Sequence, residues 1–576
     1  MPSSTFKLLV LSTTLTCGAS SWARAQAAGE PPAPSCDGLR VSRIDIQPGR
    51  PPFTGQASRW RNVARAVGLH HATTRDGVID AFLALDVGEP CTEIRRAESE
   101  RLLRAQPFLA DATVRAIPDG AGGVAVEVRT VDEIPVLVNG RFRGLAPRAL
   151  SLGNENVGGL GLLLEANIER GYAYRTGFGA RIVEYATFGR PYVASLEAER
   201  YTLGHRVGVS LAHPFYTDLQ RIGWHAGYLT SNEYPGLRRP ARDELALGVR
   251  QERWEGSSLY RVFGTSTVGL LGAAASGLRL TPQPRGIVVS DTGLARDTGT
   301  TLLGRYSRFG TTRVGVLGGV RRVTFRTVRG FDGLTAQQDV ANGAFAGLYV
   351  AKGLPSFGDG DLFLSGIAYA GGGGTKVYVA SLTQVEGRRG SGLNRWDSVI
   401  GSSRSALYLG RGPGWVFITE DQFSGGTRSL LPLQLALGDR QGGILGYHES
   451  ALAGAYRNVA RTELRWTGAS LVRNADVGFA TFTQVGTIWA GDAPYGRNAT
   501  RTSVGVSVLA AYPTGSKRLY RADVGIPLTR NGEGGGKIEV RFASEDRTQQ
   551  FWREPHDVSR ARTGTVPTSL FAFPTR

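Results

Sequence analysis

The segment from Val459 to Phe542 contains repeated stretches in which every second residue is apolar and the residues between them are charged or small. Between residues 460 and 466, one face of an extended chain would carry Ala460, Thr462, Leu464 and Trp466, and the other Arg461, Glu463 and Arg465. Because side chains alternate across a strand, one face must meet apolar surroundings while the other carries several full charges. A soluble sandwich would place the charges outside in water, whereas a membrane barrel would place them in a wet lumen. The alternation alone allows both folds.

Residues 1–25 have the features of a signal peptide. Lys7 precedes an apolar stretch from Leu8 to Leu15, and Ala23, Arg24 and Ala25 form a small-residue cleavage site. We therefore expect an exported protein from which this segment, including Cys17, has been removed.

Beyond that segment, no apolar run approaches the roughly 18 residues that a membrane-spanning helix needs. The run Val268–Leu278 is among the longest, and glycines interrupt it. Since every backbone polar group must be paired within lipid, an exported membrane protein without such helices has to be a closed barrel. The 79 glycines in 576 residues are about double the usual share, which suits the bends and turns of a curved sheet.

The formal net charge of +18 would favour nucleic-acid binding in a cytoplasmic protein. Export argues against a nucleic-acid partner, and the basic residues are spread among strand-like segments. A charged lumen and rim account for this charge, and contact with anionic lipid head groups is the narrower alternative. We expect membrane lipid to be a partner.

The N-terminal part of the mature chain, residues 36–133, has a different texture and predicts a small α+β domain. The expected elements are a strand at 39–46, a helix at 74–85, a helix from Thr92 to the residue before Pro107 that buries Ile94, Ala97, Leu102 and Ala105, and strands at 112–117 and 124–131. About 95 residues suffice for one small core. Residues 47–71 exceed this plan and predict an insertion with a helix around 60–67.

Cys36 and Cys91 both fall in this domain. An exported protein meets an oxidising compartment, so we expect them to form a disulfide. The alternative is two free, unrelated thiols.

Residues 138–543 consist of strand-like segments punctuated by glycine, and residues 544–576 form a C-terminal tail. About 10 residues per spanning strand, with short turns on one side and longer loops on the other, predict around 16 strands. The expected fold class is mainly β: a transmembrane antiparallel barrel preceded by the small α+β domain.

Four segments, in this order, resemble motifs of one superfamily of bacterial outer-membrane proteins. They are Asn156–Gly161, Pro214–Tyr216, Leu437–Tyr447 and Arg521–Pro527. The chain is similar in them to the BamA, TamA and FhaC type, also called the bacterial surface antigen family. The resemblance implies a periplasmic POTRA region, a 16-stranded barrel in the outer membrane, and a role in inserting or translocating polypeptides. One POTRA-like domain fits before the barrel, fewer than the principal assembly factor carries.

The resemblance further implies that residues 437–447 belong to a lid loop folded into the barrel. The residues that match the lid motif are Gly438, Asp439, Arg440, Gly443, Leu445, Gly446 and Tyr447. The family has an arginine where this chain has Leu445, and an aspartate where Phe482, Thr483 and Gln484 form the partner segment. In the family, this arginine and this aspartate are partners in an ion pair. A buried charge without its partner costs several kcal/mol, whereas replacing both members of the pair by neutral residues is close to neutral in free energy. We expect packing and neutral hydrogen bonds to hold the lid.

Another segment, Val328–Phe331, spells the lid motif but lies near the middle of the expected barrel. About five strand-like segments follow Tyr447, as the family topology requires, and too much chain follows Phe331. We therefore assign the lid to residues 437–447.

The sequence predicts no catalytic residues, metal site or cofactor. Residues Gly371–Lys376 do not meet the phosphate-loop pattern. His205, His213 and His225 could join Ser210 in a hydrolase site, but no spaced acid supports this. No cluster of cysteine and histidine suggests zinc.

The expected function is insertion or translocation of polypeptides. An extended polypeptide would bind the N-terminal domain by strand addition at an exposed sheet edge, with residues 39–46 or 124–131 as candidates. A passive pore or structural barrel is the alternative, and a barrel hydrolase is the third.

Overall fold

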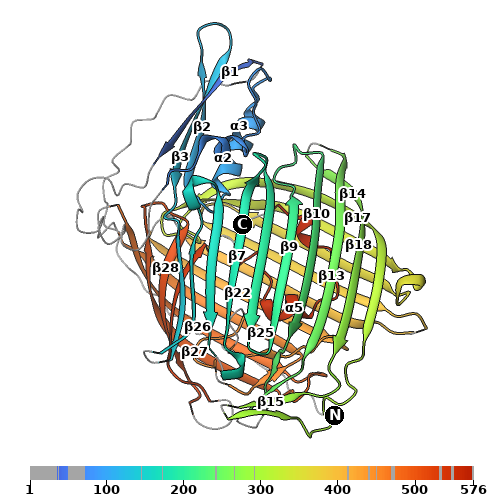
Figure 1. Cartoon of the computed structure of the whole chain (residues 1–576). Coiled ribbons are helices and arrows are strands. Elements are labelled where there is room, and N and C mark those ends of the chain that lie inside the picture. Colours follow the sequence, from blue (N-terminus) through green and yellow to red (C-terminus); the bar gives the residue numbers. More distant parts are fainter. Residues whose placement is uncertain are drawn as a thin grey trace, which may run out of the picture.

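The computed structural model describes residues 36, 38–49, 72–143, 146–170, 173–239, 243–264, 266–290, 292–392, 394–410, 414–438, 442–448, 450–468, 474–530, 535–546 and 550–573. The expected signal peptide, the helix expected around residues 60–67, and Asp439 and Arg440 lie outside the described residues. A closed barrel forms the body of the molecule, and a small N-terminal module covers one end of it (Figure 1). We call this end the module end and the opposite one the far end.

The described part of the module contains a three-stranded sheet and two helices, in the predicted order. Its elements are β1 (Val41–Gly49), α2 (Asp76–Asp80), α3 (Glu93–Arg104), β2 (Leu109–Pro118) and β3 (Val124–Asp132). The sheet order is β1-β3-β2, with β1 parallel and β2 antiparallel to β3. The prediction that residues 124–131 form an exposed edge is therefore wrong, because β3 is the central strand. The expected edge at residues 39–46 overlaps β1, which is an outer strand of this sheet.

Helix α3 begins where the sequence indicates. The hydroxyl of Thr92 accepts a hydrogen bond of 3.3 Å from the main-chain N–H of Arg95, which caps the helix, and Glu93 adds a negative charge to its first turn. Leu102 and Leu103 are buried, whereas Ile94 is 67% exposed, contrary to expectation. The module's apolar core continues into the barrel, where Tyr185 and Tyr216 pack against it.

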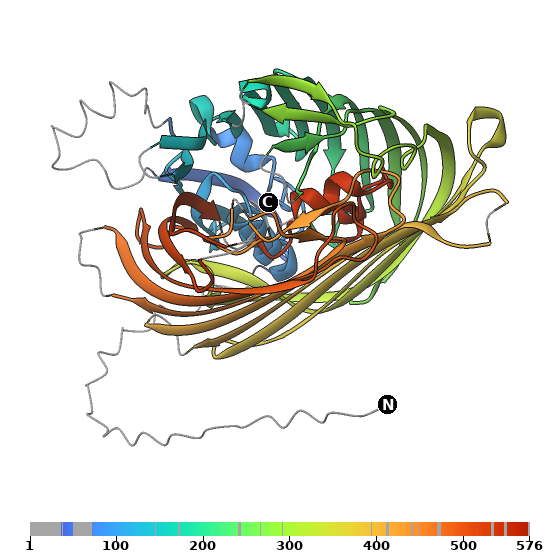
Figure 2. The same cartoon turned by 90° about the horizontal axis from the view of Figure 1, so that it is seen from below.

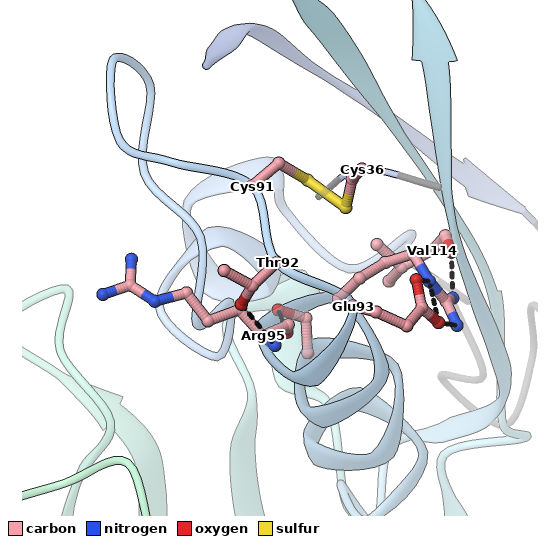
Figure 3. The surroundings of a disulfide bond; sticks show 8 residues. Cys36, Cys91, Thr92, Glu93, Arg95 and Val114 are labelled. Atoms are coloured by element: carbon pink, nitrogen blue, oxygen red, sulfur yellow. Dashed lines mark hydrogen bonds and ion pairs between the residues drawn. A yellow bond between two sulfur atoms is a disulfide. The ribbon is translucent and has the colours of Figure 1, made fainter. Parts of the chain in front are cut away.

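A disulfide joins Cys36 to Cys91, immediately before α3 (Figure 3). Both cysteines are fully buried. The disulfide ties the start of the module to helix α3. This helix contacts the sheet of the module, since its Arg96 donates a hydrogen bond of 2.6 Å to the carbonyl of Val114 in β2.

The barrel has 20 antiparallel strands, so the prediction of about 16 is wrong. The strands nearest the N-terminus are β4 (Val136–Arg143), β5 (Ala146–Asn154), β6 (Leu162–Glu169), β7 (Gly177–Thr187), β8 (Tyr192–Tyr201), β9 (Gly204–His213), β10 (Ile222–Glu233), β13 (Val249–Phe263), β14 (Val268–Pro282) and β17 (Phe309–Arg329). The others are β18 (Gln337–Gly353), β19 (Leu362–Gly373), β20 (Val377–Arg389), β21 (Asp397–Gly410), β22 (Trp415–Thr427), β25 (Tyr456–Thr467), β26 (Asp476–Trp489), β27 (Ala499–Ala511), β28 (Arg518–Pro527) and β29 (Glu539–Asp546). Connections shorter than expected leave room for the additional strands: two residues, 202–203, join β8 to β9, and residues 374–376 join β19 to β20.

Smaller elements lie in the connections. Strands β11 (Gly236–Leu237), β12 (Glu244–Ala246), β15 (Ile287–Ser290) and β16 (Gly293–Arg296) form a four-stranded sheet at the far end, and β23 (Leu435–Ala436) pairs with β24 (Ala453–Gly454). The 3-10 helices are η1 (Val157–Gly159), η2 (Ala173–Arg175), η3 (Pro355–Phe357) and η4 (Thr568–Phe571), and α5 spans His556–Ala561. No helix in the described part of the chain is long and apolar enough to cross a membrane.

The two faces of the barrel wall differ as the alternation predicts. Along β26, Phe482 and Gln484 are buried on the inner face, while Phe479 and Val485 are exposed on the outer face. Arg465 of β25 is fully buried inside, and its neighbour Leu464 is exposed outside. The full charges of this part of the sequence therefore lie in the lumen.

Candidate functional site in the barrel lumen

The connection between β22 and β25 folds into the lumen and carries the residues of the predicted lid. Leu437 and Tyr447 are fully buried, and Ile444 is nearly so. With Leu452, Val459 and Ile488 they form an apolar cluster against the inner faces of β25 and β26. We call residues 428–455 the inward loop. Most of its described residues pack on the wall.

Glycines allow the inward loop to fold tightly. A Cβ atom at Gly438 would lie 2.0 Å from the carbonyl oxygen of Tyr447, so no larger residue fits where the two arms of the loop meet. Gly446 has a φ of +93°, a conformation that favours glycine. Its N–H donates a 2.8 Å hydrogen bond to the carboxylate of Glu539, and its carbonyl accepts one of 2.8 Å from the main chain of Lys537.

The structure brings Leu445 and Gln484 together. The contact is a hydrogen bond of 3.1 Å from the main-chain N–H of Leu445 to the Oε1 atom of Gln484. The same oxygen accepts a longer bond, of 3.4 Å, from the hydroxyl of Ser503. The side chain of Leu445 lies elsewhere, beside Gly525 of β28, where an added Cβ would come within 2.5 Å of the Leu445 Cβ. A neutral amide and close packing thus hold this part of the loop.

Tyr447 completes the attachment. Its hydroxyl donates to the carbonyl of Thr502 over 3.0 Å and accepts from the N–H of Thr529 over 3.1 Å. With the contacts of Leu445 and Gly446, these bonds fasten the inward loop to four consecutive strands, β26 to β29. Phe482 instead contacts the wall, because its ring lies under the guanidinium of Arg461, which is 4.3 Å from the ring centroid.

A chain of buried charges runs along the inner wall beside the inward loop. Glu463 accepts from Arg465 over 2.9 Å and from Arg521 over 2.7 Å, Arg521 reaches Asp523 over 2.5 Å, and Asp523 reaches Arg541 over 3.0 Å. Alternation places these residues on one face, but the pairing between strands comes from the register of β25, β28 and β29 and was not predicted. Arg465 also donates to the carbonyl of Phe331 over 2.8 Å. The second lid-like segment therefore lies at the module end, in the connection between β17 and β18.

The barrel closes between its first and last strands. Strand β29 pairs with β4 over four residues of each strand, from Asn139 opposite Ala543 to Phe142 opposite Val540. We call this junction the seam. At its module end, the hydroxyl of Ser544 accepts a 3.2 Å bond from the N–H of Val138, outside the ladder.

The module is fastened to the barrel at two places. The carboxylate of Glu133 accepts from the hydroxyl of Ser516 over 2.7 Å and from the N–H of Lys517, the residue before β28, over 3.1 Å. Far around the ring from the seam, Arg104 of α3 forms a bidentate ion pair with Asp339 of β18, with both distances 3.0 Å.

The residues of the hydrolase alternative have other partners. The hydroxyl of Ser210 contacts that of Ser195 at 2.7 Å, His213 contacts Gln220 at 2.8 Å, and His225 contacts Glu255. A hydrolase site would need the serine beside a histidine. Gly371–Gly373 end β19, and residues 374–376 form a turn. Within the described residues, no group of three or more histidine, cysteine or acidic side chains could hold a metal ion.

Comparisons with known proteins give the following. No family model matches the chain, and no curated protein matches it. Among solved structures, it is similar to BamA from Haemophilus ducreyi lacking POTRA domains 1–3, with 12% identity, a TM-score of 0.38, and coverage of 88% of this chain and 85% of that chain. It is similar to CdiB from Acinetobacter baumannii, with 9% identity, a TM-score of 0.42 and coverage of 88% and 73%. CdiB from Escherichia coli gives 10% identity, a TM-score of 0.39 and coverage of 90% and 92%.

Proposed function

We propose that this chain is a barrel of the bacterial outer membrane that inserts or translocates polypeptides, with its module, POTRA-like in order of elements, in the periplasm. The observation that carries the proposal is the short seam. Strand β4 pairs with β29 over four residues but with β5 over eight. Because fewer ladder hydrogen bonds hold the seam, it opens at lower cost than its neighbours. An open seam exposes two unpaired strand edges, which bind extended polypeptide.

The strands beside the seam are also the short ones. β4, β6 and β29 have 8 residues each, whereas β17 has 21. At a rise of about 3.3 Å per residue, a strand of this length spans roughly 26 Å before any tilt. A short apolar band thins the bilayer around it, which lowers the cost of moving polar backbone into lipid. Lipid is thus a partner of the proposed reaction.

The inward loop is positioned to control the seam. Gly446 of the loop bonds to Glu539 in the seam strand β29, and Leu445 bonds to Gln484 three strands away. Release of the loop would free β29 on its luminal side. We propose that the loop acts as a lid that keeps the seam closed until a client polypeptide binds.

The module supplies a place for the client to bind first. Strand β1 (Val41–Gly49) pairs with β3 and is an outer strand of the three-stranded sheet. An extended client can add to such an edge through main-chain hydrogen bonds, with little dependence on its sequence. The contact between Glu133 and Lys517 lies close enough to the seam to connect the two sites.

The passive-pore alternative requires an open lumen. The inward loop and residues 550–573 both occupy the lumen in this structure (Figure 2). This favours a gated barrel, which would show little ion conductance in planar bilayers, over a pore that is always open.

Reconstitution tests the proposal. The full chain would be placed in liposomes and mixed with an outer-membrane β-barrel client unfolded in urea, and client folding would be followed by its faster migration on unheated gels. We expect folding to be several times faster than in liposomes that contain a passive porin of similar size. Equal rates in both would reject the proposed function.

A further inference from the structure

The C-terminal segment that follows the last strand returns into the lumen. Residues 550–573 lie inside the ring of strands, with α5 near the centre of the barrel (Figure 2). Val558 and Phe571 are buried. No residue of the segment 550–573 belongs to a barrel strand, and the ladder closes between β29 and β4 without this segment. The segment, which we call the luminal tail, can therefore leave its place without breaking a ladder hydrogen bond.

The wall holds the luminal tail by its main chain. Arg313 of β17 donates to the carbonyl of Thr563 over 3.1 Å, and Arg321 of the same strand donates to the carbonyl of Phe571 over 3.2 Å. Glu386 of β20 accepts from the N–H of Thr563 over 2.7 Å and from that of Gly564 over 3.1 Å. Every residue of a polypeptide offers a carbonyl group and every residue except proline an N–H group, so these contacts depend little on the tail's own sequence.

The wall arginines are held in place without the tail. Arg313 forms two hydrogen bonds to Asp361, of 3.1 and 2.6 Å, and Arg388 pairs with the same carboxylate over 3.1 Å. Asp218 holds Arg321 over 2.9 Å. We call the space that the luminal tail fills along the wall the groove. A guanidinium fixed by a carboxylate keeps its remaining N–H groups pointing into this groove. The groove is thus preformed and would keep its shape after the tail has left.

One position of the groove is shaped for an aromatic ring. A Cβ atom added at Gly347 of β18 would lie 2.2 Å from Phe571, and one added at Gly319 of β17 would lie 2.8 Å from it. Gly319 and Gly347 both lack a positive φ, so the backbone conformation does not require glycine at either position. The lack of a side chain at these two positions instead makes room for the Phe571 ring. Arg321 also lies 3.9 Å from the centre of the Phe573 ring.

The remaining anchors of the tail are ion pairs. Arg562 pairs with Glu386 over 3.2 Å, Arg560 with Glu233 over 2.9 Å, and Asp557 with Arg457 over 3.0 Å. Buried ion pairs contribute little net stability because desolvation offsets their attraction. These contacts fix the register of the tail and can be exchanged for water or for another peptide.

The tail does not use everything that the groove offers. A cavity of about 990 Å³ borders it, lined by Phe551, Glu554 and Leu570 of the tail and by Arg404 of β21. Arg404 is 5% exposed, and its three guanidinium nitrogens have no hydrogen-bond partner among the described residues. The negative charge of Glu554 in the tail interacts with this guanidinium. Since a buried cation without a counter-charge is costly, this position favours an occupant that carries an acidic side chain.

We propose that the inner faces of β17 to β21 form a binding groove for an extended polypeptide with an aromatic and an acidic side chain, and that the luminal tail is its displaceable resident occupant. The inference rests on the proposed function, which supplies the client, and it names the lumen as a second place where the client binds. Binding of the client displaces the tail, and the tail returns when the client has left.

Peptide binding tests the groove in the full chain. The probe is a fluorescein-labelled peptide with the sequence of residues 551–573, which includes both Glu554 and Phe571, and its dissociation constant is measured by fluorescence anisotropy in detergent. The variant Phe571→Ala loosens the resident tail and leaves the wall intact. We expect it to bind the probe about tenfold or more tightly than the wild type. The further change Gly347→Val fills the aromatic position and should abolish this gain.

A second probe keeps the test independent of how well the wall variant folds. The same peptide with alanine in place of its phenylalanine at position 571 should bind the Phe571→Ala protein at least about tenfold more weakly than the first probe. Equal binding of both probes, or equal binding by wild type and Phe571→Ala, would overturn the inference. Peptide binding does not require membrane insertion, so lost binding with intact client folding in liposomes rejects the groove alone. Intact binding without client folding rejects the proposed function alone.

Discussion

The main-chain N–H of Leu445 donates a hydrogen bond of 3.1 Å to the side-chain oxygen of Gln484. A neutral amide thus holds the inward loop at the position where an ion pair would have required two buried charges. Gln484 is 5% exposed, so loss of its oxygen would leave the N–H group of Leu445 without a nearby acceptor.

Replacing Gln484 tests that bond. Gln484→Leu should lower the free energy of unfolding by about 1–3 kcal/mol, because a buried donor loses its acceptor. Thermal unfolding in detergent measures the loss. Equal stability of Gln484→Leu and the wild type would show that the bond does not hold the loop.

A charge exchange tests whether the two positions are coupled. Leu445→Arg alone buries a cation and Gln484→Asp alone an anion, whereas the double variant restores opposite charges. We expect a coupling free energy of about 1–3 kcal/mol in a double-mutant cycle, reduced where lumen water reaches the pair. Additivity within about 0.5 kcal/mol would mean that the introduced side chains do not meet.

The inward loop packs closely against Gly525, so a larger residue at that position should disturb it. An added Cβ at Gly525 would come within 2.5 Å of Leu445, whereas one at Gly256 of β13 would meet nothing within 4 Å. Gly525→Ala should displace the inward loop and raise ion conductance in planar bilayers, and Gly256→Ala should leave conductance unchanged. Identical conductance of the two variants would contradict the proposed attachment of the loop.

The buried charge chain predicts a large effect at its centre. Glu463→Gln removes the negative charge between Arg465 and Arg521, and we expect a loss of about 3–5 kcal/mol, because buried Arg465 loses a counter-charge and Arg521 keeps only its pair with Asp523. Glu252→Gln, at a partly exposed ion pair of 2.9 Å with Arg250, serves as the control and should cost less than about 1 kcal/mol. Unfolding in detergent should separate the two variants, and a similar loss in both would argue against the chain.

The disulfide should stabilise the module against unfolding. It closes a separation of 55 residues between Cys36 and Cys91. The double change to serine should destabilise the module by about 2–4 kcal/mol in the loop-entropy model. Limited proteolysis measures this as faster cleavage of residues 72–132 while the barrel stays resistant. Mass spectrometry that found both thiols free in the unreduced protein would exclude the bond itself.

The sequence predicted the features that depend on neighbouring residues, namely the two faces of the strands and the start of a helix. Alternation along residues 459–542 gave the barrel wall and its charged inner face, as Leu464 and Arg465 show. The cap at Thr92 predicted the start of α3. The strand count failed because connection lengths, such as the two residues between β8 and β9, leave no periodic signal.

Long-range relationships could not be predicted in this way. The central place of β3 depends on a parallel pairing with β1, across about 80 residues of sequence. The luminal tail carries the six-residue helix α5, and charged side chains from four barrel strands, β10, β17, β20 and β25, hold the tail in place. No window of the sequence contains these partners together.

Opening of the seam can be tested by locking it. Cysteines at Asn139 and Ala543, which are paired across the seam, can join β4 to β29 by a disulfide. Cysteines at Leu152 and Ala166, paired between β5 and β6, form the matched control. We predict that the oxidised seam variant stops folding the client in liposomes, that reduction restores the wild-type rate, and that the control folds the client in both states. Wild-type client folding by the fully oxidised seam variant would show that folding does not require the seam to open.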